Sequence, residues 1–175
     1  MWTSPSRPVP GRTVVIGLGN PLMGDDGIGI AALQRLRSEW SLPAAVALVD
    51  GGIWGMRLLP EIEDADRLLL LDAIDVGANP GTLQVLERGQ IPRYLATKIS
   101  SHQVDLQDVL ALAELRGTLP QQTVAIGLQP AAVEWSGEIS DAVRPGLDAL
   151  VLAVVRQLEQ WGLTCQPTAP APAHA

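Results

Sequence analysis

Short apolar runs alternate with longer periodic stretches along the chain. Five runs are short, rich in aliphatic residues and bounded by turn residues, which favours strands. They lie at residues 13–17, 46–49, 68–71, 82–86 and 123–127. Continuous apolar runs of this kind are typical of strands buried on both faces of a sheet. The run at 82–86 alternates instead, as a half-exposed strand does.

The stretches between these runs repeat their apolar residues with a helical period. The clearest lie at 28–40, 106–113 and 147–158, and residues 53–63 predict a shorter helix. Asp105 precedes the second stretch, and we expect it to cap that helix. Strands that alternate with helices predict an α/β fold. We expect a three-layer α/β/α sandwich around a mostly parallel, twisted sheet of about five strands.

Proline-rich ends flank this alternating region. Residues 1–12 predict a flexible leader, and residues 163–175 predict a flexible Pro/Ala tail. Residues 13–162 then form a single α/β domain. No secretory signal is visible, and no apolar run approaches the roughly 20 residues that span a membrane. We therefore expect a cytoplasmic protein without membrane contact.

Charge and residue counts narrow the chemistry. The chain has 12 Lys and Arg against 19 Asp and Glu, a formal charge of −7, which disfavours a nucleic-acid partner. A single cysteine excludes a disulfide framework and a Cys-based zinc or iron–sulfur site within one chain. Of the two histidines, His174 lies in the predicted tail. Metal or acid–base chemistry must therefore draw mainly on carboxylates.

Carboxylates follow three predicted strands in a row. Asp26 follows the first, Asp50 ends the second and Asp72 ends the third, while His102 stands before a predicted helix. The carboxyl ends of parallel strands meet at one edge of the sheet, where ligands bind. We expect Asp26, Asp72 and His102 to converge there, and clustered like charge is costly without a cation. Two carboxylates and an imidazole suit nickel, manganese or zinc.

Each of these residues also has an ordinary structural interpretation. Asp26 could cap the first predicted helix, with Asp25 accepting N–H groups at its start. Asp50 and Asp72 could be turn residues, and His102 could be a hydrogen-bonded or exposed residue at a helix start. The interpretation as a metal site depends on their occurring together.

Other enzyme motifs are incomplete or missing. Gly17-x-Gly19 begins like a dinucleotide fingerprint, but Leu22 stands where the third glycine belongs. The sequence contains no GxxxxGK[ST] loop, no GxSxG elbow and no HExxH. Cys165 has no nearby His or Cys, so we interpret it as incidental rather than as a nucleophile.

A series of motifs resembles the [NiFe]-hydrogenase maturation endopeptidases over about residues 13–162. The opening segment 17–29 reads GLGNPLMGDDGIG. In the family's order there follow Asp50-Gly51-Gly52, Gly55-Met56, LDAID at 71–75, PGT at 80–82, SHQ at 101–103 and GLQP at 127–130. The segment 101–117 most resembles the enzymes that serve membrane-bound uptake hydrogenases.

The resemblance implies a nickel-dependent endopeptidase with a phosphorylase/hydrolase-like fold. Such an enzyme removes the C-terminal peptide from the precursor of the hydrogenase large subunit after nickel insertion. The family's catalytic metal contacts fall on Asp26, Asp72 and His102, and relatives often carry Glu at the first position. The precursor would carry the nickel, and we expect the free enzyme to hold none tightly. Asp50, Gly51 and Gly52 are predicted to border the substrate groove, because glycine lets a peptide approach closely.

Two other functions fit part of the sequence. Peptidyl-tRNA hydrolases also open on Gly-Leu-Gly-Asn-Pro, but they carry a catalytic histidine soon afterwards, and residues 21–60 contain none. The acidic charge also suits tRNA poorly. A non-catalytic nickel-binding maturation factor, or a nucleotide-binding module, would use the same side chains. Only a cleavage assay separates that function from a protease.

Overall fold

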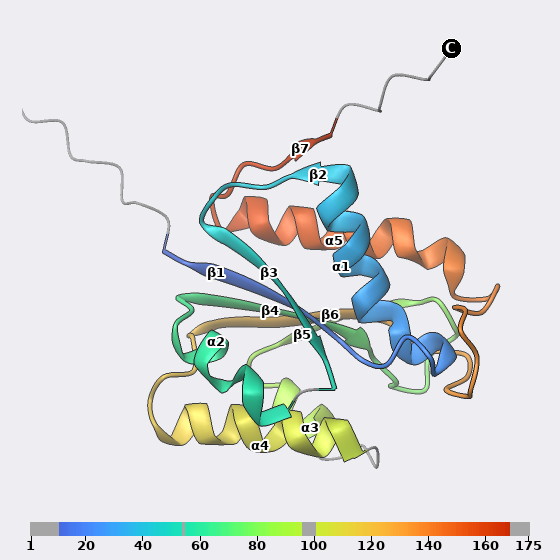
Figure 1. The fold of residues 1–175 in the computed structure, drawn as a ribbon, viewed down its shortest axis with the longest axis horizontal. Coiled ribbons are helices and arrows are strands. Elements are labelled where there is room, and N and C mark those ends of the chain that lie inside the picture. The colour runs from blue at the N-terminus through green and yellow to red at the C-terminus, as the bar shows by residue number, and fades with distance from the viewer. Residues whose placement is uncertain (1–10, 54, 96–100, 169–175) are drawn as a thin grey trace, which may run out of the picture.

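Five strands form one twisted sheet in the order β3-β1-β4-β6-β5 (Figure 1). The structure is a computed structural model that describes residues 11–53, 55–95 and 101–168, with the backbone alone for 101–105. Four strands are parallel, and β5 runs antiparallel to β6. Their bounds are β1 Thr13–Leu18, β3 Val46–Gly52, β4 Arg67–Ala73, β5 Leu83–Glu87 and β6 Gln122–Leu128. The predicted, mostly parallel sheet is confirmed.

Helices cover both faces of this sheet, as the three-layer prediction requires. Helices α1 (Ile28–Glu39) and α5 (Leu147–Gln160) pack on one face. The other face carries α2 (Leu59–Glu63), α3 (Ile91–Leu95) and α4 (Ser101–Leu115). The described residues also contain 3-10 turns: η1 Gly24–Gly27, η2 Gly55–Leu58 and η3 Arg144–Gly146.

The continuous apolar strands follow from this sandwich. In β4, Leu69 and Leu71 enter the core beneath α1 and α5, while Leu68 and Leu70 enter the core on the opposite face. Successive side chains of a strand point to opposite faces, so a central strand with two covered faces needs apolar residues at every position. Edge strand β5 has only one covered face, and its Leu83 and Val85 are exposed.

Two boundaries differ from the sequence predictions. Helix α4 begins at Ser101, so Asp105 lies inside it and not at its N-cap. The packed structure also continues past residue 162: Leu163 and Cys165 are buried, and β7 (Gln166–Pro167) pairs with β2 (Trp40–Ser41). A predicted tail from 163 therefore begins too early. Residues 1–10 of the predicted leader and 169–175 of the tail lie outside the described residues.

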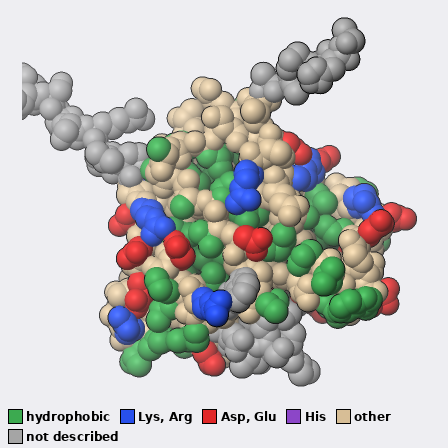
Figure 2. All heavy atoms as spheres, viewed as in Figure 1, with side chains coloured by type: hydrophobic (Ala, Val, Ile, Leu, Met, Phe, Trp, Pro, Cys, Tyr) green, Lys and Arg blue, Asp and Glu red, His purple; other side chains and the backbone are tan. Residues whose placement is uncertain are grey.

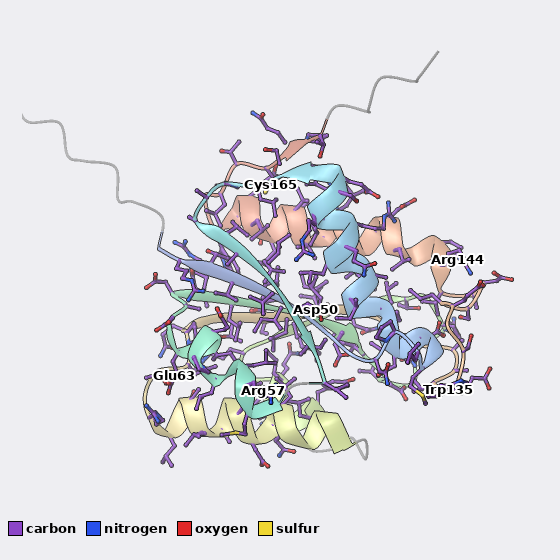
Figure 3. All side chains as sticks on the ribbon, in the orientation of Figure 1. Asp50, Arg57, Glu63, Trp135, Arg144 and Cys165 are labelled. Atoms are coloured by element: carbon purple, nitrogen blue, oxygen red, sulfur yellow. The ribbon has the colours of Figure 1, made fainter. Side chains whose placement is uncertain are left out.

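Cys165 lies in this added segment, close to the end of α5 (Figure 3). Burial, and next the negative charge of Glu159, raise the pKa of its thiol above the ordinary value. A nucleophilic cysteine needs the opposite shift.

Among the helices of the described ranges, none is long and apolar enough to cross a membrane.

Candidate functional site

Asp72 lies at the carboxyl end of β4, between two parallel neighbours. Its register partner on β6 is Gly127, and its side chain is only 5% exposed. The carboxylate accepts a 2.8 Å hydrogen bond from the N–H of Ala73. A Cβ on Gly127 would come within 1.9 Å of the Asp72 carbonyl oxygen, so only glycine lets β6 pass this closely. The position of Asp72 is therefore set by rigid elements.

Asp26 lies in η1, beyond the glycine-rich turn that follows β1, and is 3% exposed. Its Oδ2 accepts a 2.7 Å hydrogen bond from the N–H of Asn20, back in that turn. Gly27 occupies the N-cap of α1 without a side-chain cap, so Asp26 does not cap this helix. Gly19 has φ +104°, and a Cβ there would lie 1.8 Å from the carbonyl oxygen of Asp26. The turn thus depends on glycine at position 19.

Tyr94, on α3, contacts the turn that follows Asp72. Its hydroxyl donates to the carbonyl of Ala73 and accepts from the N–H of Asp75, both at 3.1 Å. Burial and then the negative charge of Asp72 raise the pKa of Tyr94, with smaller contributions from the charges of Asp75 and Asp26, while the hydrogen bond from Asp75 lowers it. The lone tyrosine of the sequence therefore holds the turn that follows Asp72.

His102 is the second residue of α4, and its side chain lies outside the described residues. Among the described side chains, no three His, Cys, Asp or Glu residues group closely enough to hold a metal ion. The structure thus brings Asp26 and Asp72 to one edge of the sheet, and the contribution of His102 stays a prediction.

The predicted groove residues behave differently from one another. Asp50 is exposed on edge strand β3 (Figure 3). Gly51 is buried, and a Cβ there would lie 2.6 Å from the Ile16 side chain. Gly52 accepts a 3.0 Å hydrogen bond from the N–H of Gly19 through its carbonyl. The space beside Gly51 is taken by the chain itself, and the groove role stays a prediction.

Asp25 has a role that the sequence did not indicate. It is completely buried, and its carboxylate accepts hydrogen bonds from residues 131, 132 and 140, far along the chain. It therefore does not serve the start of the first helix. The sequence gives one signal for this role of Asp25: two acidic residues stand next to each other, although the start of one helix needs only one of them.

Exposed apolar side chains surround this edge of the sheet. They follow the carboxyl ends of β1, β3, β4 and β6: Leu22, Ile53, Met56, Val76, Val133 and Trp135. Figure 2 shows apolar side chains gathered at the right-hand end of the view, where Figure 3 labels Trp135. Buried acids ringed by exposed apolar residues suit a site that receives a protein rather than a small polar molecule.

Comparisons with known proteins agree with this geometry. A family model described as hydrogenase maturation protease matches residues 30–157, more than half of the chain. Hydrogenase expression/formation protein HupD of Rhodobacter capsulatus is 40% identical over 156 residues, covering 88% of this chain and 74% of that protein. Hydrogenase 2 maturation protease of Escherichia coli K12 is 32% identical over 157 residues, covering 89% of this chain and 96% of that protein.

Solved structures share the fold. The hydrogenase maturating endopeptidase HybD from E. coli superposes with a TM-score of 0.87 at 30% identity, over 91% of this chain and 99% of that one. The [NiFe] hydrogenase maturation protease HybD from Thermococcus kodakarensis gives 0.68 at 26% identity, over 83% and 97%. These matches decide for a protease over a peptidyl-tRNA hydrolase or a non-catalytic binding protein. The chain belongs to the hydrogenase maturation proteases, a family of hydrolases that cleave peptide bonds.

Proposed function

We propose that this protein acts in the cytoplasm and removes the C-terminal peptide from the nickel-bearing precursor of a [NiFe]-hydrogenase large subunit. The observation that carries the proposal is the pair of buried carboxylates, Asp26 and Asp72, at the carboxyl edge of the sheet. Asp26 comes after β1 and Asp72 lies at the end of β4, and these two strands are parallel neighbours in the sheet. Membership of the maturation protease family supplies the reaction class.

Nickel enters this proposal as part of the substrate. Asp26, Asp72 and His102 are the contacts through which the enzyme would recognise the metal that the precursor carries. Two buried carboxylates near each other gain stabilisation from a cation, and carboxylate with imidazole suits a borderline divalent ion. The precursor's own ligands supply the rest of the coordination shell. A precursor without nickel therefore lacks the charge that these acids would contact.

The chain offers no activated nucleophile in the described part of this site. Cys165 lies elsewhere and its pKa is raised. The proposed reaction is accordingly attack of water on the scissile amide, with the substrate's metal next to the bond supplying polarisation. Asp26 and Asp72 hold the metal-bearing end of the precursor in place. The contacts that recognise the metal therefore also position the scissile amide.

Nickel dependence provides the test of this function. The protein is mixed with nickel-loaded and nickel-free precursor in parallel, and release of the C-terminal peptide is followed by mass spectrometry. We expect cleavage of the nickel-loaded precursor alone. A family member of known activity on that precursor serves as the positive control. Equal cleavage of both forms contradicts the nickel part of the proposal, and cleavage of neither, with an active control, contradicts the function.

The shorter acid at position 26 gives a second prediction. Asp26→Glu keeps the charge but adds one methylene to a side chain that is 3% exposed. We expect cleavage of the nickel-loaded precursor to be retained, with a loss of stability of about 1–3 kcal/mol from overpacking. Peptide release and thermal unfolding measure the two effects. A folded but inactive Glu variant would show that the site has adapted to the shorter acid.

A further inference from the structure

We infer that residues 131–140 form a preformed recognition segment for the precursor, and that Asp25 is the positioning residue that holds this segment in shape. The inference rests on the proposed function and assigns its partner surface. It starts from a completely buried carboxylate that accepts four hydrogen bonds. Asp25 carries this carboxylate immediately before the proposed metal contact Asp26.

The Asp25 carboxylate ties both ends of the segment to η1. Its Oδ2 accepts hydrogen bonds from the N–H of Ala131 at 2.8 Å, the N–H of Ala132 at 3.2 Å and the hydroxyl of Ser140 at 2.9 Å. Its Oδ1 accepts from the N–H of Ser140 at 2.8 Å. Four donors on one buried carboxylate make strong, charge-assisted contacts. The two ends of the segment are therefore fixed at a single point.

Backbone contacts join the middle of the segment to the turn before Asp26. The N–H of Gly24 donates to the carbonyl of Ser136 at 2.8 Å, and the N–H of Ser136 donates to the carbonyl of Leu22 at 3.0 Å. Gly24 takes φ +60° to make this approach. The recognition segment is thus hydrogen-bonded to the same turn that places Asp26.

This rigid base presents its apolar side chains to solvent. Trp135 is 79% exposed, and Val133 and Leu22 on either side of the backbone contacts are about half exposed. A segment that served only to cover the sheet would turn its tryptophan inward. An exposed tryptophan on a preordered backbone loses little entropy on binding, and tryptophan is enriched among the central residues that carry most of the binding energy of protein interfaces.

Charged residues of the segment, and of the turn that follows it, indicate the chemistry of the partner. Glu134 is exposed and forms no ion pair with any other described residue. Glu138 and Asp141 flank Arg144, each at 3.7 Å from the guanidinium. Three acids against one base leave the surface negative. The matching face of the precursor is therefore an apolar patch bordered by Lys or Arg.

Trp135→Ala tests the surface without touching the core. Calorimetric titration with nickel-loaded precursor gives Kd, and peptide release gives KM and kcat separately. We expect Kd and KM to rise about tenfold with kcat within about twofold. Leu115→Ala is the matched control, because Leu115 is 84% exposed at the far end of α4. We expect no change in any of the three constants for this variant.

The outcomes separate the two proposals. An unchanged Kd for Trp135→Ala, with a wild type that binds, overturns the recognition segment whatever happens to cleavage. A weaker Kd supports the segment even if the wild type does not cleave, which would contradict only the proposed function. A wild type that binds no nickel-loaded precursor overturns both.

Asp25→Asn tests the positioning role. An amide in place of the carboxylate must turn an NH₂ group toward at least one of the four donors, so the ends of the segment loosen. We expect faster hydrogen exchange of the amides at 131–140 together with a raised KM. If this variant does not fold, Ser140→Ala removes only the hydroxyl contact and gives the same pair of readouts. Faster exchange with an unchanged KM would overturn the positioning role.

Discussion

Asp72→Asn is expected to abolish processing of the nickel-loaded precursor while leaving the fold intact. The amide oxygen can still accept the N–H of Ala73, so the end of β4 keeps its local hydrogen bond. The negative charge offered to the metal is lost. We expect kcat/KM to fall about a thousandfold, equivalent to about 4 kcal/mol of transition-state stabilisation. Peptide release followed by mass spectrometry measures the rate, and thermal unfolding checks the fold.

Asp64→Asn is the matched control for this change. Asp64 has a side chain that is 75% exposed, pairs with Arg12 across 3.7 Å, and lies just after α2. Loss of a surface charge there should leave cleavage unchanged.

We expect His102→Ala to abolish cleavage as Asp72→Asn does. Normal processing by either variant would show that the metal assignment is wrong at that position.

Gly29→Ala is expected to produce the largest loss of stability of any single methyl addition in α1. A Cβ at this position would lie 2.1 Å from the carbonyl oxygen of Leu71 and 2.5 Å from that of Leu18. Both atoms belong to central strands and cannot rotate away, so α1 must lift off the sheet. We expect a loss of about 3 kcal/mol or more, lowering Tm by about 10 °C. Chemical and thermal unfolding measure both.

Gly89→Ala is the control for the added methyl group. Nothing lies within 4 Å of a Cβ built on Gly89. Its expected change in free energy of unfolding is within about 0.5 kcal/mol, as for an ordinary surface substitution. Equal melting of the Gly29 and Gly89 variants would contradict the close contact between α1 and the sheet. Because η1 leads directly into α1, a lifted helix should also displace Asp26 and slow cleavage.

The strands and their main helices could be predicted from the sequence because each element's pattern reflects its own burial. The apolar run from Leu68 to Leu71 is continuous since both faces of β4 are covered, whereas β5 has one covered face and leaves Leu83 and Val85 exposed. The placement of Asp72 followed from the same reasoning, because the end of a buried parallel strand is fixed once the strand is known. The order of the motifs along the chain likewise indicated the protein family.

Several glycines took on a different meaning in three dimensions. Gly51 was predicted to leave room for a substrate peptide, but the position where its Cβ would lie is occupied by the Ile16 side chain. The Cβ positions of Gly17 and Gly19 are likewise occupied, by the backbone of Gly29 and of Asp26. The sequence shows that a residue has no side chain, and not which neighbour uses the space. That neighbour is chosen by the packing of α1 and β1.

The sequence by itself determined the layered fold, the strand ends that carry Asp26 and Asp72, and the family of proteases to which they point. The tertiary structure alone decided the hydrogen-bond partners of Asp25, which lie 106 to 115 residues away along the chain. It also decided the position of Tyr94 against the turn after Asp72. The physical reason is that periodicity and capping are local, set by residues within a few positions of each other. A hydrogen bond across a hundred residues is fixed only when separate elements pack together.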